Sequence, residues 1–313
     1  MSSQKTLLQL TESNYYSLEA DRQYMSCSLF QDFIECEAAA MAYLEGRWEK
    51  ESTEALLVGN YFHSYFESPE AHEKFCEEHF DEIFKTKYLK KTDETVVTGK
   101  YKAYETADKM IQTILDDELC MTFVEMPGEN EKILTGTLFG IPWKAKLDKY
   151  VKNGRLIIDY KTCSSVYETK YNPQTNQKET FVEIYGYLMR AAVYTELEKQ
   201  NIPPEENPDN ADPPFILMCV SKEEPPDKEL VSLKHRARYD QELEFIKERL
   251  PRIIMLMNHQ QAPRKCGMCA YCRSVKKLTD IKPYYKLMPE FREAREDDFE
   301  SDFYKILEET KLP

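Results

Sequence analysis

The sequence lacks any apolar run long enough to cross a membrane. The longest such run covers residues 215–220, whereas a transmembrane helix needs about 20 consecutive apolar residues. The first ten residues, MSSQKTLLQL, also lack the basic start and the apolar stretch of a secretory signal. No internal repeat or low-complexity tract is visible. We therefore expect a cytoplasmic protein with no membrane-bound part.

An excess of positive charge is missing as well. The 313 residues include 56 acidic and 42 basic side chains, which gives a net charge of −14, whereas nucleic-acid-binding proteins usually present a basic surface. Two stretches depart from this balance: residues 144–170 hold seven Lys/Arg and three acids, and residues 249–277 hold seven Lys/Arg and no acid. The excess acid lies elsewhere, notably in 290–309. Such runs are commonly solvated faces, but both coincide with motifs of chemical interest.

The composition favours a folded domain with free thiols. With 42% hydrophobic and 12% aromatic residues, the chain can bury a substantial core. Its nine cysteines do not indicate a disulfide framework, because the expected cytoplasmic compartment is reducing. Five of them stand isolated and are typical of small core residues: Cys27, Cys76, Cys120, Cys163 and Cys219.

Hydrophobic periodicity predicts a mixed α/β (α+β) fold. Helical spacing covers residues 25–46 and 52–67, and residues 73–118 are charged and helical in character. Short strand-like segments rich in β-branched and aromatic residues follow at 121–126, 132–140, 142–151 and 155–163. Asn153-Gly154, between the last two, is a strong hairpin signal.

The second half of the chain continues this mixture of helices and strands. A polar loop at 164–179 is long enough to suggest a function. After it come an amphipathic helix (180–199), a Pro-rich acidic linker (202–214), strands at 215–220 and 229–233, and a helix over 237–258 that is kinked at Pro251. This order predicts a central mixed sheet flanked by helices, with a helical N-terminal lid.

The clearest chemical signal comes from Asp148, Asp159 and Lys161. Side chains alternate along a strand, so Asp159 and Lys161 point to one face and Tyr160 to the other. The Asn-Gly hairpin folds the strand of Asp148 beside them, so that two carboxylates and an ammonium group converge. Carboxylates suit Mg²⁺, and a metal with a nearby lysine provides what phosphodiester hydrolysis requires. The alternative is a structural ion pair, but charges in so apolar a strand are costly unless they are paired or coordinated.

These residues resemble the active-site motif of the PD-(D/E)XK nucleases: Asp148, an eleven-residue step to Asp159, and Asp-Tyr-Lys. The most similar group is that of the phage and prophage exonuclease VIII (RecE-like) nucleases, with kinship to RecB-type nuclease domains. Two further motifs extend the resemblance over most of residues 25–275. Gly59-Asn-Tyr-Phe-His63 is similar to the upstream G-x-x-x-H helix motif, and Ser28-Leu-Phe-Gln-Asp-Phe-Ile-Glu-Cys36 is similar to the N-terminal S-x-L-x-x-[FY]-x-x-C motif.

The resemblance implies a restriction-endonuclease-like core with a metal site. Mg²⁺, or Mn²⁺, would be bound by His63, Asp148, Asp159 and the backbone carbonyl of Tyr160. For His63 the alternative is a hydrogen-bonded core histidine, although imidazole is a common metal ligand.

One family motif is altered in this chain, and two acids match accessory positions loosely. The family usually has Q-x-x-x-Y on the helix after the active-site strand, but this sequence has Arg190-Ala-Ala-Val-Tyr194. A DNA contact made there is therefore expected to differ. Glu125 and Glu183 are candidate accessory acids, with an exposed helical residue as the alternative for Glu183.

The triplet Cys266, Cys269 and Cys272 places three thiols at the tight spacing of a metal site. Soft ligands of this kind suit an iron–sulfur cluster or Zn²⁺. RecB-like nucleases with a cluster use one cysteine ahead of the nuclease core and three after it, which implies Cys36 as the fourth ligand. The resemblance favours a structural [4Fe–4S] cluster over Zn²⁺, although the last spacing in those proteins is usually longer. Free thiols in a basic segment are the remaining alternative.

The predicted function is that of a metal-dependent exonuclease acting on double-stranded DNA ends in phage-type recombination. The resemblance further implies 5′→3′ digestion, a ring-shaped homo-oligomer and a partner that anneals the single strand produced, in a bacterial host cell. The alternatives are a RecB-like nuclease of the CRISPR-adaptation type and a non-catalytic DNA-binding module with a structural metal centre. We expect one structural domain overall, made of an N-terminal helical segment (1–50), the nuclease core (51–260) and a cysteine-cluster segment with an acidic tail (261–313).

Overall fold

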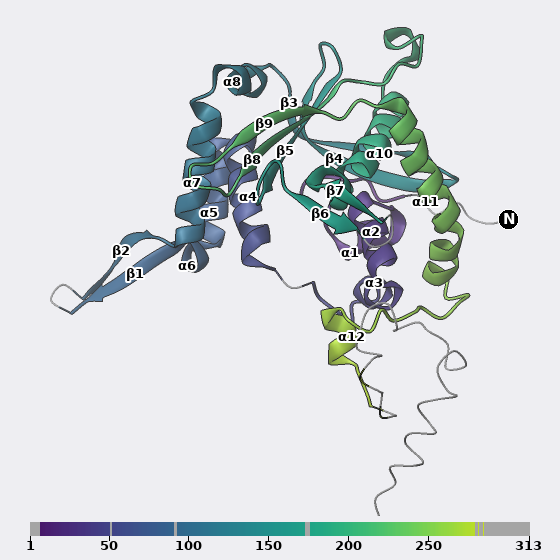
Figure 1. Cartoon of the computed structure of the whole chain (residues 1–313), viewed down its shortest axis with the longest axis horizontal. Coiled ribbons are helices and arrows are strands. Elements are labelled where there is room, and N and C mark those ends of the chain that lie inside the picture. Colours follow the sequence, from purple (N-terminus) through teal and green to yellow (C-terminus); the bar gives the residue numbers. More distant parts are fainter. Residues whose placement is uncertain are drawn as a thin grey trace, which may run out of the picture. The chain divides into compact units, whose positions relative to one another are not determined.

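A mixed five-stranded sheet forms the centre of the computed structural model, which describes residues 7–50, 52–90, 93–172, 176–278, 281 and 284. The strand order is β3-β4-β5-β8-β9. β5 and β8 run parallel, and the other neighbours are antiparallel. The strands are β3 (Glu129–Leu138), β4 (Ile141–Val151), β5 (Leu156–Cys163), β8 (Phe215–Ser221) and β9 (Lys228–Ser232). The predicted fold class, a central mixed sheet flanked by helices, is confirmed (Figure 1).

One face of the sheet packs against α4 and α7. Val58 of α4, Met110 of α7 and Ile158 of β5 belong to one buried apolar cluster. The Thr53 side chain starts α4 by accepting the N–H of Leu56, as its sequence predicts. The helices of this side are α4 (Glu54–Glu67), α5 (Pro69–Glu78), α6 (Phe80–Ile83), α7 (Lys102–Leu115) and α8 (Glu118–Glu125).

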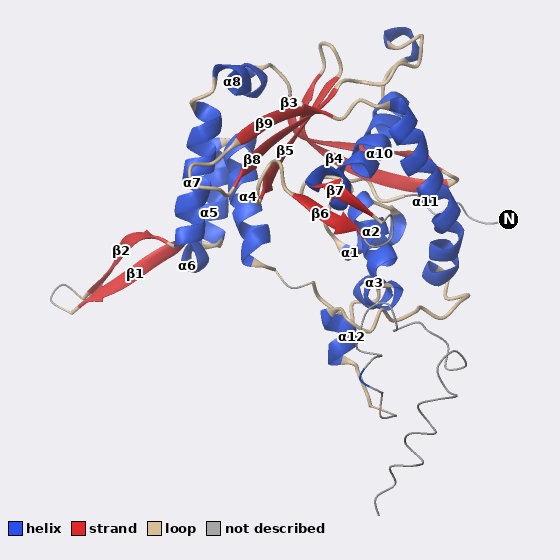
Figure 2. Cartoon of the chain, viewed as in Figure 1, coloured by secondary structure: helices blue, strands red, loops and turns tan. Residues whose placement is uncertain are grey.

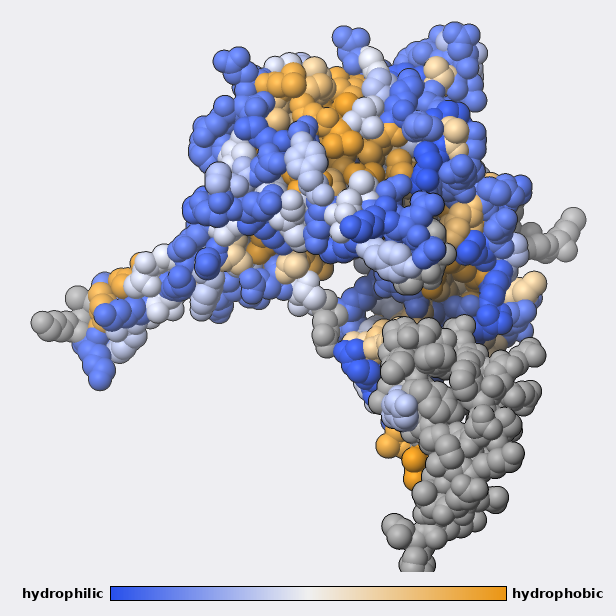
Figure 3. All heavy atoms as spheres, viewed as in Figure 1, coloured by the Kyte–Doolittle hydropathy of each residue, from blue (hydrophilic) through white to orange (hydrophobic). Residues whose placement is uncertain are grey.

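The other face packs against α10, α11 and the N-terminal helices. Val193 of α10, Ile246 of α11 and Leu217 of β8 belong to the second buried cluster. The helices here are α1 (Leu18–Gln23), α2 (Cys27–Glu35), α3 (Glu37–Leu44), α9 (Phe181–Ile184), α10 (Tyr187–Gln200) and α11 (Arg236–Met257), with a 3₁₀ turn η1 (Pro204–Glu206) between α10 and β8. Figure 3 shows hydrophobic residues gathered over the central sheet and hydrophilic residues over the surrounding helices.

Two small hairpins stand apart from the sheet (Figure 2). The first pairs β1 (Phe84–Leu89) with β2 (Glu94–Lys100). It lies within residues 73–118, so the expected helical character is wrong there. The second pairs β6 (Thr169–Asn172) with β7 (Gln177–Thr180), inside the predicted polar loop 164–179.

Three other elements differ from their predicted form. Residues 121–126, predicted as a strand, form the second half of helix α8 and its C-cap, Met126. Asp117 starts this helix by accepting the N–H of Cys120 at 2.9 Å. The predicted helix 180–199 is interrupted at Gly186, whose φ is 65°. The predicted helix 25–46 is interrupted at Cys36, whose backbone is extended. Local capping and turn geometry therefore override the periodicity at these points.

The β4–β5 hairpin is anchored to α10 through a buried carboxylate. Glu198 of α10 is 1% exposed, and it accepts hydrogen bonds from Arg155 Nη2 at 2.6 Å and from the Tyr150 hydroxyl at 2.8 Å. Because Tyr150 lies on β4 and Arg155 lies in the turn just before β5, this network holds the hairpin against the helix.

Contacts divide the chain into two compact units, Met1–Cys266 and Gly267–Pro313. All elements above belong to the first unit. In the second, helix α12 (Ala270–Ser274) begins where Cys269 Sγ accepts the N–H of Cys272 at 3.4 Å. The acidic stretch 290–309 lies outside the described residues. Among the residues that are described, no helix combines the length and apolarity needed to span a bilayer.

Candidate active site

The two central strands β4 and β5 separate beside Asp148. Their ladder covers only three residue pairs and ends where Lys149 faces Ile158. Beyond that pair, the Asp148 side chain replaces the backbone partner: its Oδ2 accepts the backbone N–H of Tyr160 at 2.8 Å. A carboxylate therefore occupies the gap between the strands and satisfies a backbone donor that the ladder leaves free.

Lys161 draws the two aspartates together at this gap. Its Nζ lies 2.7 Å from Asp159 Oδ2 and 3.4 Å from Asp148 Oδ2, and it also donates to the Tyr160 carbonyl at 2.7 Å. The structure thus brings Asp148, Asp159 and Lys161 together, as the alternation along β5 predicts.

Helices from both faces of the sheet reach the same point. His63 of α4 approaches with Nδ1 3.4 Å from Asp148 Oδ2. Arg190 of α10 approaches from the opposite layer, with Nη1 3.7 Å from Asp159 Oδ1. The gap between β4 and β5 gives both layers access. We call His63, Asp148, Asp159, Lys161 and Arg190 the carboxylate cluster.

Asp159 is buried without a full set of partners. Its side chain is 3% exposed, and neither oxygen accepts a hydrogen bond from the residues that the structure describes. The Lys161 and Arg190 cations lie near it but not in hydrogen-bond geometry. Buried carboxylate oxygens are normally satisfied, so these lone pairs remain available to a ligand.

The protonation states in the cluster suit a metal ion. Burial alone would raise the pKa of Asp148, but Lys161, His63 and the Tyr160 N–H together hold that pKa below its usual value, so the group is ionised at neutral pH. Burial lowers the pKa of His63 and outweighs the nearby Asp148, which keeps the imidazole neutral. Ionised carboxylates and a neutral imidazole are the ligating forms of these side chains.

The chemistry of this donor set fits Mg²⁺ or Mn²⁺, although the donors are spread. Carboxylate and carbonyl oxygens with one imidazole match the preferences of these ions. In the described part of the chain, His63, Asp148 and Asp159 do not bring three ligand atoms within 4.8 Å of one another. The Lys161 ammonium lies between the two carboxylates instead and neutralises them there.

Glu131 of β3 is a further acid at this place that the sequence did not single out. The pairs on either side of it in the β3–β4 register place it opposite Asp148. Its carboxylate forms an ion pair with Lys146, yet burial raises the pKa of Glu131 to about 7, and the charge of Asp148 adds to the rise. Glu131 could have been identified from the sequence only by predicting the register between β3 and β4, which sets it opposite Asp148.

The remaining predicted residues occupy different surroundings. Tyr194 is buried one helical turn after Arg190, and burial raises its pKa far above the usual value. Glu183 closes a capping box, in which its Oε2 accepts the Thr180 N–H at 3.0 Å, so this acid serves the start of α9. Glu125 is exposed at the end of α8, and within the described chain no contact joins it to the carboxylate cluster.

The cysteines predicted as ligands are divided between the two units, with Cys36 and Cys266 in the first and Cys269 and Cys272 in the second. In the first unit, the chain beside Cys36 pairs with the chain before Cys266, since the Ala38 N–H donates to the Arg264 carbonyl at 3.0 Å and the Arg264 N–H donates to Glu37 Oε2 at 2.8 Å. This pairing brings the chain around Cys36 to the end of the first unit, and thiols that could hold a metal ion are those of Cys36, Cys266, Cys269 and Cys272.

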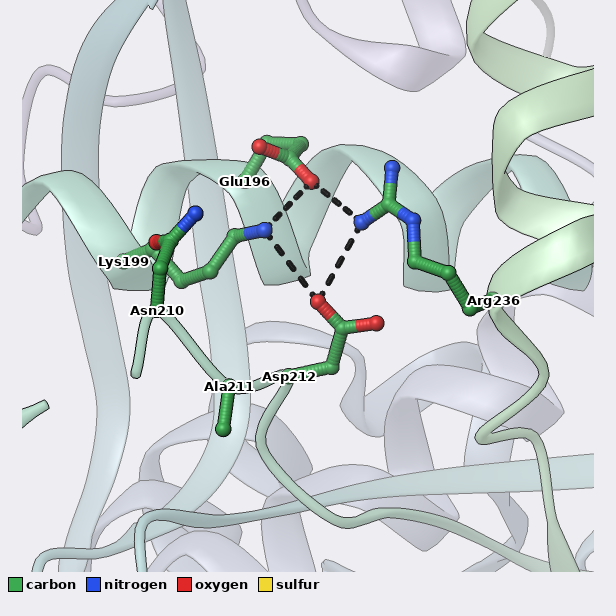
Figure 4. A pocket seen from close by; sticks show the side chains of 6 residues that line it. All are labelled: Glu196, Lys199, Asn210, Ala211, Asp212 and Arg236. Atoms are coloured by element: carbon green, nitrogen blue, oxygen red, sulfur yellow. Dashed lines mark hydrogen bonds and ion pairs between the residues drawn. The ribbon is translucent and has the colours of Figure 1, made fainter. Parts of the chain in front are cut away.

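A second charged group on α10 lines a cavity of about 430 Å³ (Figure 4). Lys199 Nζ lies 2.7 Å from Glu196 and 3.1 Å from Asp212. Arg236 Nη1 lies 2.7 Å and 3.2 Å from the same two carboxylates. We call Glu196, Lys199, Asp212 and Arg236 the ion quartet. Each charge in it has two opposite neighbours, which is the arrangement of a structural network.

The geometry around Asp148 and Asp159 is that of a PD-(D/E)XK nuclease fold, and comparison with known proteins agrees. The chain belongs to the family described as "PDDEXK-like domain of unknown function (DUF3799)", which matches residues 26–275. The predicted membership of the PD-(D/E)XK superfamily is therefore confirmed.

Solved structures give a similar result. A protein of Eubacterium rectale, provisionally described as an exonuclease, is 30% identical, with 90% of this chain and 99% of that chain covered and a TM-score of 0.77. The crystal structure of SSO0001 is 15% identical over 80% of this chain and 96% of that chain, with a TM-score of 0.30, a likeness that supports no argument. No curated protein matches.

Proposed function

We propose that the protein is a metal-dependent exonuclease that hydrolyses phosphodiester bonds at the ends of double-stranded DNA. The observation that carries this proposal is the convergence of Asp148, Asp159 and Lys161 at the gap between β4 and β5, with the Asp159 oxygens buried and accepting no hydrogen bond. Family membership supports the nuclease class, and the Eubacterium rectale protein, provisionally described as an exonuclease, supports the mode of cleavage.

Each residue of the carboxylate cluster would have its own role in hydrolysis. A bound Mg²⁺ or Mn²⁺ would supply Lewis acidity toward the phosphate and acidify a water. His63, Asp148, Asp159 and the Tyr160 carbonyl would hold it. Lys161 would move off Asp159 and place its positive charge beside the phosphate, where negative charge develops.

Arg190 would act on the same site from α10. It lies 3.7 Å from Asp159 Oδ1, where the family usually has a glutamine. A permanent cation at this position would balance the charge of the Asp159 carboxylate and keep it oriented while Lys161 turns toward the phosphate.

The wider setting is proposed from the resemblance to the exonuclease VIII group. It comprises 5′→3′ digestion, a ring-shaped homo-oligomer, a single-strand annealing partner and phage-type recombination in the bacterial cytoplasm. The four-cysteine group favours a second candidate, a RecB-like nuclease of the CRISPR-adaptation type, because those enzymes share this layout.

We further propose that Cys36, Cys266, Cys269 and Cys272 hold a structural [4Fe–4S] cluster. The backbone pairing of Ala38 with Arg264 supports it, because this pairing carries one ligand to the segment of the other three. Protein purified without oxygen should be brown and contain iron and sulfide, and Cys36→Ser should lose both together with thermal stability. Cys76→Ser, at a half-buried cysteine outside the group, is the matched control. Iron-free protein would overturn the cluster, and stoichiometric zinc would assign a Zn²⁺ site instead.

Incubating the protein with linear DNA tests the function directly. DNA labelled at the 5′ or at the 3′ end, with Mg²⁺ and beside a closed circular control, should lose nucleotides progressively from its ends while the circle stays intact. Cutting of the circle would show that the protein is an endonuclease and not an exonuclease. Binding without cleavage in Mg²⁺ and in Mn²⁺ would favour a DNA-binding module.

A further inference from the structure

Aromatic rings connect the carboxylate cluster to the protein surface. Lys161 Nζ lies 5.9 Å from the centre of the Tyr187 ring, and Arg190 Cζ lies 5.7 Å from it. The Tyr185 ring follows, with its centre 6.1 Å from that of Tyr187 and a 38° angle between the two planes. Two ring-sized steps therefore lead outward from the ammonium that contacts both aspartates.

Tyr185 is the exposed end of this row. It is 47% exposed, so part of its ring is open to a partner from solvent. Lys170 of the β6–β7 hairpin lies over it, with Nζ 5.6 Å from the ring centre and 3.3 Å from the hydroxyl. The row thus has cations at both ends, Lys161 inside and Lys170 outside.

The backbone holds Tyr185 firmly in this exposed place. Gly186, next to it, has φ +65°, and a Cβ there would meet Gln31 Nε2 at 2.2 Å. The same Gln31 amide donates to the Tyr185 carbonyl at 3.3 Å. The capping box of Thr180 and Glu183 fixes the helix α9 that precedes it. A surface aromatic anchored in this way is pre-organised for contact.

Two more exposed tyrosines lie on the segment between β5 and α9. Tyr167 is 72% exposed and Tyr171 is 60% exposed. Exposed tyrosines interleaved with a lysine form the usual surface for unpaired nucleic acid, because bases stack on the rings and the cation attracts the backbone.

We propose that Tyr185 is a stacking platform for an unpaired base of the DNA strand whose phosphate lies at the carboxylate cluster. The inference rests on the proposed function and narrows its substrate to strand ends with at least one unpaired nucleotide. A base inside a duplex has both faces covered by its neighbours, and a terminal base pair exposes one face only as part of a rigid duplex end, so a base released at an end is the one that can turn and lie flat on the ring. Lys170 and Lys161 contact the phosphates on either side of that base.

The test measures binding without cleavage. A fluorescein-labelled oligothymidylate and a blunt duplex of equal length are titrated with the full-length protein in EDTA, using wild type, Tyr185→Ala and Tyr185→Phe. Stacking on one ring predicts that Tyr185→Ala binds the single strand between about five-fold and about a hundred-fold more weakly. Tyr185→Phe should bind it as wild type does, because phenylalanine keeps the ring face.

Tyr88→Ala is the matched control, since Tyr88 is 55% exposed on the separate β1–β2 hairpin. It should bind the single strand as wild type does. A strand with 2-aminopurine at its end reports stacking itself: wild type and Tyr185→Phe should quench its fluorescence, and Tyr185→Ala should not.

Several results would overturn the platform. They are unchanged single-strand binding in Tyr185→Ala, an equal loss for the single strand and the blunt duplex, or the same loss in Tyr88→Ala. A failure of the platform can be distinguished from a failure of the proposed nuclease function. If the Tyr185→Ala variant cleaves DNA normally, only the platform is refuted. If the wild type stacks on 2-aminopurine but never cleaves DNA, only the nuclease activity is refuted.

Discussion

The carboxylate cluster and the ion quartet are built from the same chemical groups, two aspartate or glutamate side chains and two strong cations, and both draw on α10. In the quartet, Glu196 and Asp212 each have Lys199 and Arg236 within 3.2 Å. In the cluster, Asp159 accepts no hydrogen bond from the described residues. Both sites therefore place cations beside their carboxylates, but Asp159 is neutralised by Lys161 and Arg190 without accepting a hydrogen bond from either.

This difference separates a structural network from a candidate active site better than the presence of a cavity does. A cavity lies over the quartet, where every charge is already matched and Arg236 is 43% exposed. In the carboxylate cluster, Asp159 is more deeply buried than any side chain of the quartet, at 3% exposed, and its oxygens accept no hydrogen bond from the described residues. Imbalance of this kind is characteristic of functional sites.

The carboxylate cluster and the ion quartet should differ most in their effect on catalysis. Asp159→Asn or Lys161→Ala should reduce DNA cleavage by about a thousand-fold or more, because each removes a group that acts on the developing charge. DNA binding and the circular dichroism spectrum should stay close to wild type. Asp212→Asn, in the quartet, should cleave normally. Near wild-type cleavage by either cluster variant would move the active site elsewhere.

Metal removal gives the next largest effect. EDTA should abolish cleavage, and Mg²⁺ or Mn²⁺ should restore it, while Ca²⁺ should bind without supporting cleavage. At a hundred times its Kd, Mg²⁺ should stabilise the wild type by about 2.7 kcal/mol, measured as a rise in Tm. Asp159→Asn should lose this rise, His63→Ala should need more Mg²⁺ for it, and Asp212→Asn should retain it. An equal rise in all variants would place the metal outside the cluster.

The stability of the protein should also depend on pH through Glu131. Burial raises its pKa from 4.5 to about 7, so the folded protein holds this proton more tightly than the unfolded chain does. The resulting stabilisation is present below pH 4.5 and is lost as the pH rises through about 7. Glu131→Gln cannot ionise, so relative to wild type it should be more stable at pH 8 than at pH 4.5, by up to about 3 kcal/mol.

Urea unfolding at pH 4.5, 6 and 8 measures this difference. Glu196→Gln, in the quartet, is the control and should show no comparable trend, because its carboxylate is matched by two cations. A Glu131→Gln effect of the same size at all three pH values would contradict the assignment.

The smallest effect is expected within the quartet itself. Asp212→Asn leaves Glu196 beside Lys199 and Arg236, while Arg236 is partly exposed and keeps Asp240 as a second acidic partner. The free energy of unfolding should therefore fall by only about 1 kcal/mol. A change in the Mg²⁺ response of this variant would show that the two sites are coupled.

Local patterns explain which parts of the site were predictable from the sequence. Asp159 and Lys161 share a face because side chains alternate along a strand, and the Asn153-Gly154 turn returns the chain to Asp148. Cys36 was implied by the family resemblance rather than by its own surroundings. These features depend on few residues that are close in sequence or on a shared motif.

The missed features depend on partners that are distant in sequence. Glu196 and Arg236 are 40 residues apart and meet only because α10 and α11 pack together. The approach of Arg190 to Asp159 depends on the packing of α10 against the sheet. The β1–β2 hairpin has mostly exposed residues on both faces, so no alternation of hydrophobic and polar side chains marks its strands.

The gap between β4 and β5 has a practical consequence for trapping the protein on DNA. Asp148 receives the Tyr160 N–H in place of a strand partner, so this carboxylate closes the sheet as well as facing the substrate. Its removal would disturb the backbone that carries Asp159 and Lys161, and an inactive protein of that kind would report damage rather than chemistry. Asp159 accepts no hydrogen bond from the part of the chain that the structure describes. It is therefore the position at which we expect activity to be silenced while the scaffold for a DNA complex stays intact.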